Sequence, residues 1–450
     1  MNVDFKKNRF ILSQLNSINL RIENFKNIGK RVGFYLLVGN IASILVQLLL
    51  VPVLLFYWGA SLYGEWVVLS SIPAMFALMD FGIIAVSNNL IDKYCAEKKF
   101  ISANRVYYSS IFLLFLIFLM FIVFSLLIFF FFNNYIIEIF TKTDVGIVGF
   151  LFFLMVFDCM QSIFLNHHSA LYRTINKFHW TSNWQNLSRV IPMFFVMLVA
   201  VSGNFILEAA IIMVFVRLLI LIAMLIDMKF RLYWIKSQWF YFSNRVFKKI
   251  LKKSIGFMTL PLSNLMVLHV TTMLIAISYN TSIVALFNSL RTFTRLIPQL
   301  VSIVGRSLWS EISKIKDSNV SDVEKIYKYI LLRTIVIALF FMFFYLLIGE
   351  DFYLLWTHGE LGFDNNLFIL LVLNAIGIAI YTSLEVVLLA RNKVSSYSIV
   401  FFVISIAQVL LGWFMSSKIG ISSYPLFGFL ATVSIVLYLI FLIRKGEKCE

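Results

Sequence analysis

The residues with the clearest chemical potential are three arginines in a segment apolar enough to cross a membrane. Residues 288–311 read NSLRTFTRLIPQLVSIVGRSLWSE and contain Arg291, Arg295 and Arg306. On an α-helix, Arg295 lies about 40° and Arg306 about 60° around the axis from Arg291. Such a stripe is tolerated where it meets water, a partner carboxylate or an anionic ligand. Because guanidinium groups bind phosphate in a bidentate manner, the stripe favours an anionic ligand.

Polar residues extend this face and recur in other apolar segments. Asn288 lies about 60° and Gln299 about 80° from Arg291. We expect the remaining polar residues to line one wet internal cavity with them: Asn40, Gln47, Asp80, Asn88, Asn264, His269, Asn374 and Tyr381. The alternative for any one stripe is a hydrogen bond between helices of a dry bundle.

Four acidic residues also fall within apolar segments, namely Asp80, Asp158, Glu208 and Glu385. They could neutralise the arginines or carry a coupling proton, because burial favours the protonated form of a carboxyl group. We favour structural or mixed roles for Asp80 and Asp158, and we keep Glu385 and Asp80 as candidates for H⁺ or Na⁺ coupling. His269 is either a hydrogen-bonded core residue or a proton relay.

The elements that must position these residues are membrane helices. The chain has 450 residues, of which 61% are hydrophobic and 13% charged, and its mean hydropathy is +0.91. These values predict an all-α polytopic membrane protein. About twelve spans are expected: 32–57, 62–91, 106–132, 146–168, 183–201, 205–228, 254–278, 282–311, 327–349, 365–390, 397–416 and 423–443.

Loop charge predicts the orientation. Seven Lys or Arg residues lie in the tail 1–31 and eight in the connection 229–253, whereas the loops on the other side hold Lys142 and Lys418. Cytoplasmic loops collect such residues, so both termini are expected in the cytoplasm. The net charge of +16 follows from the same rule, and no motif points to nucleic acid.

The connection 229–253 divides the chain nearly at its middle. We expect a cytoplasmic tail with an interfacial helix at 1–31, a six-helix bundle at 32–228, a basic cytoplasmic linker at 229–253, a second six-helix bundle at 254–443 and a cytoplasmic tail at 444–450. Two bundles of one orientation predict a central cleft. Three scattered cysteines give no metal or disulfide spacing, and no cofactor is expected.

Several stretches resemble one known family. The carboxy-terminal stretches HVTTMLIAISYNTSIVALF, NSLRTFTRLIPQL and GRSLWSEIS, with LLLVPVLLFYWGASLYGEWVVLSSI and LMDFGIIAVSNNL before them, are similar to the O-antigen flippases, the Wzx type of polysaccharide transporter. That family belongs to the superfamily of the multidrug and toxin extrusion (MATE) antiporters. The resemblance extends from about Gly33 to the last span. It departs at Ser310, where the family often has proline.

The resemblance implies a bacterial inner-membrane flippase with a MATE-like fold. Its cargo would be an undecaprenyl-pyrophosphate-linked oligosaccharide for O-antigen or a similar surface polysaccharide, and its partners membrane lipids and a polysaccharide polymerase. The pyrophosphate would meet Arg291, Arg295 and Arg306. Two alternatives remain open: a cation-coupled multidrug antiporter, whose cavity should be acid-rich, and a membrane polymerase or ligase, which usually needs a large outer loop or a catalytic cluster.

Overall fold

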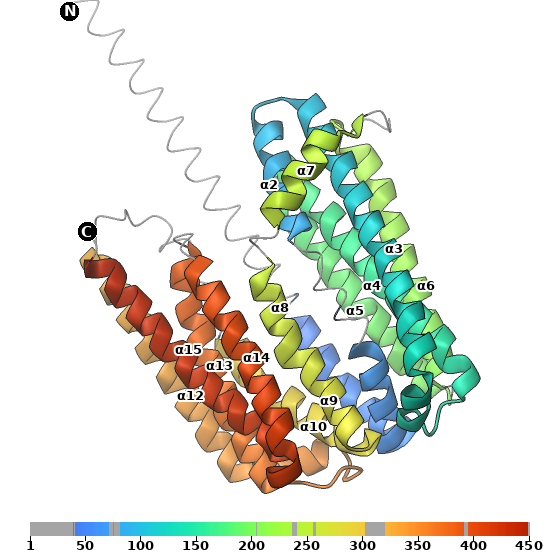
Figure 1. Ribbon diagram of the computed structural model, residues 1–450, viewed down its shortest axis with the longest axis vertical. Helices are drawn as coiled ribbons and strands as arrows, with labels where there is room; N and C mark the ends of the chain where they lie inside the picture. Colours follow the sequence, from blue (N-terminus) through green and yellow to red (C-terminus); the bar gives the residue numbers. More distant parts are fainter. Residues whose placement is uncertain are drawn as a thin grey trace, which may run out of the picture.

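The structure, a computed structural model, describes residues 39, 41–71, 75, 82–203, 205–235, 241–254, 258–301, 320–390 and 395–448. All regular structure within these ranges is helical. Figure 1 shows α2 to α7 as one group of helices and α12 to α15 as another, with α8, α9 and α10 between them. We call residues 39–254 the amino-terminal half and 258–448 the carboxy-terminal half.

The amino-terminal half begins with the helical segment Ile41–Ser71. Gly59 has a φ of 73°, a left-handed conformation that glycine adopts at little cost, and it divides this segment into two arms. The helices that follow are α2 (Ile83–Ala96), α3 (Phe100–Ile139), α4 (Val145–Ala170), the 3₁₀-helix η1 (Leu171–Ile175), α5 (Phe178–Val201), α6 (Ile206–Arg231) and α7 (Asn244–Ser254).

The carboxy-terminal half begins with one helix in three parts, because the π-helix η4 (Met266–Val270) separates α8 (Thr259–Leu265) from α9 (Thr271–Ser278). The helix α10 (Thr281–Thr294) ends at Arg295, and helical backbone resumes up to residue 301. Pro298 has no N–H to donate to Thr294, which explains the interruption. The remaining helices are α12 (Val320–Trp356), α13 (Asn365–Ala390), α14 (Ser395–Ile419), the 3₁₀-helix η5 (Gly420–Ser422) and α15 (Ser423–Lys448).

The predicted fold class is confirmed: the chain is an all-α polytopic membrane protein. Nine segments of the described residues are long and apolar enough to cross a membrane. Two of them, Ile41–Ser71 and Tyr397–Leu442, each contain residues of two predicted spans. The predicted span 282–311 runs beyond residue 301, outside the described residues. The count of twelve spans and the bounds of the two bundles therefore stay predictions, as does the helix expected within 1–31.

Two helices are longer than the spans predicted for them. The helix α3 has 40 residues and α12 has 37, whereas spans at 106–132 and 327–349 were expected. Neither helix contains a proline, so the backbone stays helical beyond the apolar stretch. As a result, the connections 140–144 and 357–364 are shorter than expected.

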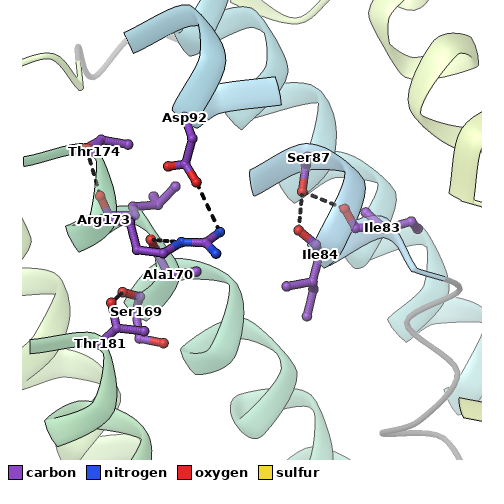
Figure 2. Close-up of polar contacts among 10 residues, drawn as sticks. Ile83, Ile84, Ser87, Asp92, Ser169, Ala170, Arg173, Thr174 and Thr181 are labelled. Carbon is purple, nitrogen blue, oxygen red and sulfur yellow. Dashed lines mark hydrogen bonds and ion pairs between the residues drawn. The ribbon is translucent and has the colours of Figure 1, made fainter. Parts of the chain in front are cut away.

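Three connections of the amino-terminal half meet at one end, which we call the inner end after the predicted orientation. Asn104 Nδ2 donates to Trp234 O at 2.7 Å, and Trp234 Nε1 donates to Thr174 Oγ1 at 2.9 Å. Arg173 pairs with Asp92 at 3.3 Å, as Figure 2 shows. Burial raises the pKa of the Asp92 carboxyl, although the Arg173 guanidinium opposes this shift. The connections predicted to share one membrane side are thus close together.

The opposite end, which we call the outer end, holds the short turns at Gly59, 279–280 and 357–364. Glu65 is fully buried there. Its carboxylate accepts hydrogen bonds from the backbone N–H groups of Lys142, at 2.7 Å, and Thr143, at 3.0 Å. The Glu65 carboxylate thus connects the second arm of Ile41–Ser71 to the α3–α4 connection through hydrogen bonds.

Candidate functional site

A cavity of about 480 Å³ lies between the two halves. The arms on both sides of Gly59 contribute Gln47, Tyr63 and Trp66 to its wall. Its other polar and charged lining residues are Ser70, Ser71, Asp158, Ser162, Arg217, His269, Asn288, Arg291, Thr292 and Arg295. Its volume falls within the range of small-molecule sites in proteins. Residues far apart in the sequence therefore form one polar chamber.

Arg291 is held by neutral oxygen atoms. Its Nη1 donates to Leu268 O at 2.9 Å, and its Nη2 donates to Thr272 Oγ1 and Asn288 Oδ1, both at 2.9 Å. The guanidinium also lies over the Phe287 ring, with its central carbon 5.3 Å from the ring centroid. None of these partners cancels the positive charge, which is left to act on the cavity.

Arg295 follows Arg291 by four residues and lines the same cavity. It lies within electrostatic range of Arg291 and Tyr381. Within the described part of the chain, neither arginine forms an ion pair with a carboxylate. Two like charges held together in this way favour an anion, which relieves their mutual repulsion.

A third arginine of the cavity is neutralised. Arg217 Nη1 lies 2.9 Å from Asp158 Oδ2, and both side chains are more than nine-tenths buried. Because the pair as a unit carries no net charge, the positive potential comes from Arg291 and Arg295. Asp158 therefore has the structural partner that the sequence left open.

The π-helix η4 shapes the carboxy-terminal wall. It contains both His269, which lines the cavity, and Leu268, whose carbonyl oxygen accepts from Arg291. A π-helix widens the backbone by one residue per turn, and such segments often occur at functional sites. In this chain, the π-helix places the Leu268 carbonyl group against Arg291, and the His269 ring within electrostatic range of Arg291 and Arg295.

The two halves contact each other near the outer end. Ser61 Oγ lies 3.2 Å from Thr281 Oγ1, and Asn288 Nδ2 donates to Tyr63 OH at 2.9 Å. The Phe56 ring packs against His358 with centroids 5.7 Å apart. Farther along the first arm, Trp356 Nε1 donates to Leu48 O at 2.8 Å, and Gln299 Nε2 donates to Gln47 Oε1 at 3.4 Å.

A second, smaller cavity of about 60 Å³ lies within the carboxy-terminal half. Arg291 and Arg295 line it together with Asn374, Gln408 and Tyr424. Leu268, Arg291 and Arg295 thus line both this space and the larger chamber.

The structure brings together most, but not all, of the predicted residues. Gln47, His269, Asn288, Arg291 and Arg295 line the larger cavity, Gln299 bonds to Gln47, and Asn374 lines the smaller cavity. Tyr381 is buried, within electrostatic range of Arg295 and Glu385. Asn40, Asp80 and Arg306 lie outside the described residues. The functional role of each remains a prediction.

Two residues are placed differently from the expectation. Asn264 is exposed and lines neither cavity. The π-helix η4 begins between it and His269, so α-helical spacing does not relate the two side chains. Asn88 is buried and also lines neither cavity. A polar residue within a span does not by itself locate a cavity.

The sequence did not identify Tyr63 or Trp66 as cavity residues, nor the pairing of Asp158 with Arg217. Aromatic residues are frequent throughout this chain, so Tyr63 and Trp66 carried no distinguishing signal. The opposite charges of Asp158 and Arg217, in the predicted spans 146–168 and 205–228, were the one available clue. Among the described residues, no group of three His, Cys, Asp or Glu side chains could hold a metal ion.

Solved structures with the same fold are membrane transporters. No protein-family model matches the sequence, and no curated protein matches it. A multidrug-resistance MATE family transporter of the MOP superfamily, in an inward-facing conformation, matches with a TM-score of 0.69 and 14% identity over 92% of this chain and 99% of that chain.

Two further structures extend this similarity. The lipid II flippase MurJ, in an inward closed conformation, matches with a TM-score of 0.69 and 17% identity over 91% of this chain and 87% of that chain. A mutant of the Vibrio cholerae MATE transporter VcmN matches with a TM-score of 0.63 and 14% identity over 94% of this chain and 97% of that chain. The chain therefore has the fold that these MATE and MurJ transporters share.

Proposed function

We propose that the chain is a flippase that moves an undecaprenyl-pyrophosphate-linked oligosaccharide from the cytoplasmic to the periplasmic leaflet. The observation that carries this proposal is the pair Arg291 and Arg295, which line a cavity between the halves without a carboxylate partner among the described residues. The cargo would be a repeat unit of O-antigen or a similar surface polysaccharide.

The charge of the site favours a diphosphate. Guanidinium groups donate paired hydrogen bonds to phosphate oxygen atoms, and these bonds are stronger where both partners are charged. Arg291 and Arg295 are four residues apart, so both side chains point to one side of the helix axis. Two such groups match the two phosphates of the proposed headgroup, and Arg306 would extend the path.

The barrier to flipping is the transfer of a charged, sugar-bearing headgroup through hydrocarbon. A polar chamber between the halves removes much of this barrier for the headgroup. The polyprenyl tail would stay in the lipid, against the exposed aromatic residues of the outer helix surfaces, such as Phe340 and Phe414. Alternating access would then expose the chamber to each side in turn.

The fold supports the class of protein, and the arginines support the cargo. MurJ is named a lipid II flippase, whereas one of the MATE transporters with the same fold is named a multidrug-resistance transporter. A cation antiporter is therefore the second candidate. The charge of the chamber opposes it, because Asp158 is its one described carboxylate lining residue and is paired with Arg217.

The remaining features of the proposal follow from the sequence. The protein would lie in the bacterial inner membrane with both termini in the cytoplasm. Glu385 and Asp80 are candidates for H⁺ or Na⁺ coupling, and a polysaccharide polymerase would receive the product. These assignments rest on loop charge, on intramembrane acids and on the family resemblance.

Reconstitution in liposomes tests the proposal. A defined undecaprenyl-pyrophosphate-linked oligosaccharide is placed in both leaflets, and its exposure to an external sugar-specific enzyme is followed over time. Replacing both Arg291 and Arg295 by Gln should slow translocation by at least ~10-fold, because two charge-assisted contacts are lost. The matched control, Arg245→Gln with Lys248→Gln, removes two exposed charges from α7 and should leave the rate unchanged.

Two results would reject the proposal. One is an equal translocation rate in the parent protein and the double arginine variant. The other is uptake of a cationic dye by the liposomes, driven by an ion gradient, with no movement of the lipid-linked sugar; that result would favour the antiporter.

A further inference from the structure

We infer that Asn288 couples the anion site to the closure of the outer end of the cavity. The inference rests on the proposed function, since it assumes that Arg291 binds the anionic part of the cargo. It assigns a positioning role to Asn288. Through this residue, anion binding at Arg291 changes the contact between the two halves at Tyr63.

The amide of Asn288 uses its two polar atoms on different partners. Its Oδ1 accepts from Arg291 Nη2 at 2.9 Å, within the carboxy-terminal half. Its Nδ2 donates to Tyr63 OH at 2.9 Å, in the amino-terminal half. A single rigid amide therefore joins a guanidinium group of the candidate site to a side chain across the cavity.

Tyr63 belongs to the contact that closes the outer end. Two residues before it, Ser61 Oγ lies 3.2 Å from Thr281 Oγ1. The next residue, Gly64, approaches the backbone of Thr281 so closely that a Cβ atom there would overlap the carbonyl oxygen. Tyr63 is itself 2% exposed. Movement of Tyr63 thus requires movement of this backbone contact.

An anion competes with Asn288 for the same donor. Arg291 gives its Nη hydrogens to Leu268 O, Thr272 Oγ1 and Asn288 Oδ1, which are neutral acceptors. A phosphate oxygen is a stronger acceptor because it is charged. When Arg291 turns to a phosphate, Asn288 Oδ1 loses its donor. A half-buried amide oxygen without a donor is costly, so the amide reorients and its bond to Tyr63 weakens.

Anion binding at Arg291 is therefore coupled to opening of the outer end. The empty site holds Asn288 in place and keeps the outer end closed, whereas the occupied site releases Tyr63 and favours opening toward the periplasm. This order suits an exporter, because the outer end opens when cargo is present.

Disulfide cross-linking measures the fraction of molecules in which the outer end of the cavity is closed. Ser61→Cys and Thr281→Cys place two thiols where hydroxyl oxygens now lie 3.2 Å apart, with Cys95, Cys159 and Cys449 replaced by Ser. The extent of cross-linking by a mild oxidant reports the closed population in liposomes. In this parent, inorganic pyrophosphate should lower cross-linking roughly three- to tenfold, the effect of one hydrogen bond on a two-state equilibrium.

Two substitutions of Asn288 should have different effects on cross-linking. Asn288→Ala removes the link, so cross-linking without ligand should fall by a similar factor and pyrophosphate should change it no further. Asn288→Asp binds Arg291 as an ion pair, and its carboxylate accepts a hydrogen bond from Tyr63 OH in place of the amide bond that Asn288 Nδ2 donates. Cross-linking should therefore stay high with or without pyrophosphate. Tyr63→Phe should reproduce the alanine variant.

The matched control is Ser289→Ala. Ser289 is the neighbour of Asn288 in α10 and is hydrogen-bonded to Tyr353 OH at 2.7 Å, within the carboxy-terminal half alone. This variant should cross-link and respond to pyrophosphate like the parent. A general loss of folding would affect Ser289→Ala and Asn288→Ala alike.

Equilibrium dialysis with radiolabelled pyrophosphate on the same proteins separates the two claims. Asn288→Ala should still bind it, because Arg291 and Arg295 remain. An Asn288→Ala variant with parental cross-linking and parental response would overturn the inference while leaving the proposed function intact. A parent that binds no pyrophosphate would reject the proposed cargo chemistry and the ligand coupling, and the ligand-free comparison of the Ala and Asp variants would still decide whether Asn288 holds the closure.

Discussion

At the scale of single residues, the cavity contains arginines in two different environments. Arg217 is paired with Asp158 at 2.9 Å, whereas Arg291 is bonded to neutral oxygen atoms. Breaking a buried pair leaves one charge without compensation, while removing an arginine with neutral partners leaves no opposite charge behind. The first arrangement supports structure, and the second is available for a ligand.

This difference predicts unequal effects on stability. Arg217→Leu should lower the free energy of unfolding by about 3–5 kcal/mol, because Asp158 is left buried without its partner, and Asp158→Leu in the same chain should restore much of the loss. Arg173→Leu, at the partly exposed pair with Asp92, should cost at most about 1 kcal/mol. Denaturant unfolding in detergent measures all three. Equal losses for Arg217→Leu and Arg173→Leu would contradict this view of the cavity.

The sequence predicted the residues that helical spacing alone places on one face. It missed the residues that reach the cavity from distant parts of the chain. Arg291, Arg295 and Asn288 were found because helical spacing alone places them on one face. The partners of those residues, such as Tyr63, were not found, because each lies far away in the sequence. Asn264 is exposed and lines neither of the two cavities, so its role stays a prediction.

At the scale of elements, close packing between helices of the carboxy-terminal half depends on small residues. In α13, a Cβ atom at Gly377 would overlap the Thr432 side chain of α15. Membrane helices associate through such close approaches, because hydrocarbon offers little hydrophobic driving force between them. The helix α13 also carries Asn374, Tyr381 and Glu385, so this contact positions part of the candidate site.

Gly377→Ala should therefore destabilise the protein by about 1–3 kcal/mol through overpacking. Adding Thr432→Gly moves the small residue to the other helix and should recover a large part of the loss. The midpoint of thermal unfolding in detergent reports both effects. A single variant as stable as the parent would show that α13 and α15 are not in close contact at this point.

Helix existence and type could be predicted from apolar length, but details of the elements could not. The helices α3 and α12 continue beyond the predicted spans, through short stretches that mix polar residues, such as Glu350 and Asp351, with apolar ones. The π-helix η4 was also not predicted, because no residue type specifies it; it depends on packing around Leu268 and His269.

At the scale of the whole molecule, the two halves meet through the arms of Ile41–Ser71 and the region around α10. One close approach among the described residues is between Gly64 and the backbone of Thr281, which no side chain larger than hydrogen allows. The six-and-six division of the chain indicated that a cleft would exist. It could not indicate which residues close the cleft, because those contacts join residues 61–64 with 281–288.

Gly64→Ala should shift the protein away from the closed outer state. The native Cys159 lines the cavity, so a membrane-impermeant maleimide applied from the periplasmic side should label it several-fold faster in this variant. Gly362→Ala is the control, because a Cβ atom there meets nothing within 4 Å. Equal labelling of Cys159 in both variants would argue against closure by the Gly64–Thr281 contact.

The most direct test of the account concerns the charge of the ligand. The dissociation constants of undecaprenyl pyrophosphate, undecaprenyl monophosphate and undecaprenol are compared for the parent protein and for Arg291→Gln with Arg295→Gln. The parent should bind the pyrophosphate at least ~10-fold more tightly than the uncharged alcohol, and the double variant should bind all three alike. A parent that does not distinguish the three lipids, or a double variant that keeps the preference, would contradict the assignment of these arginines.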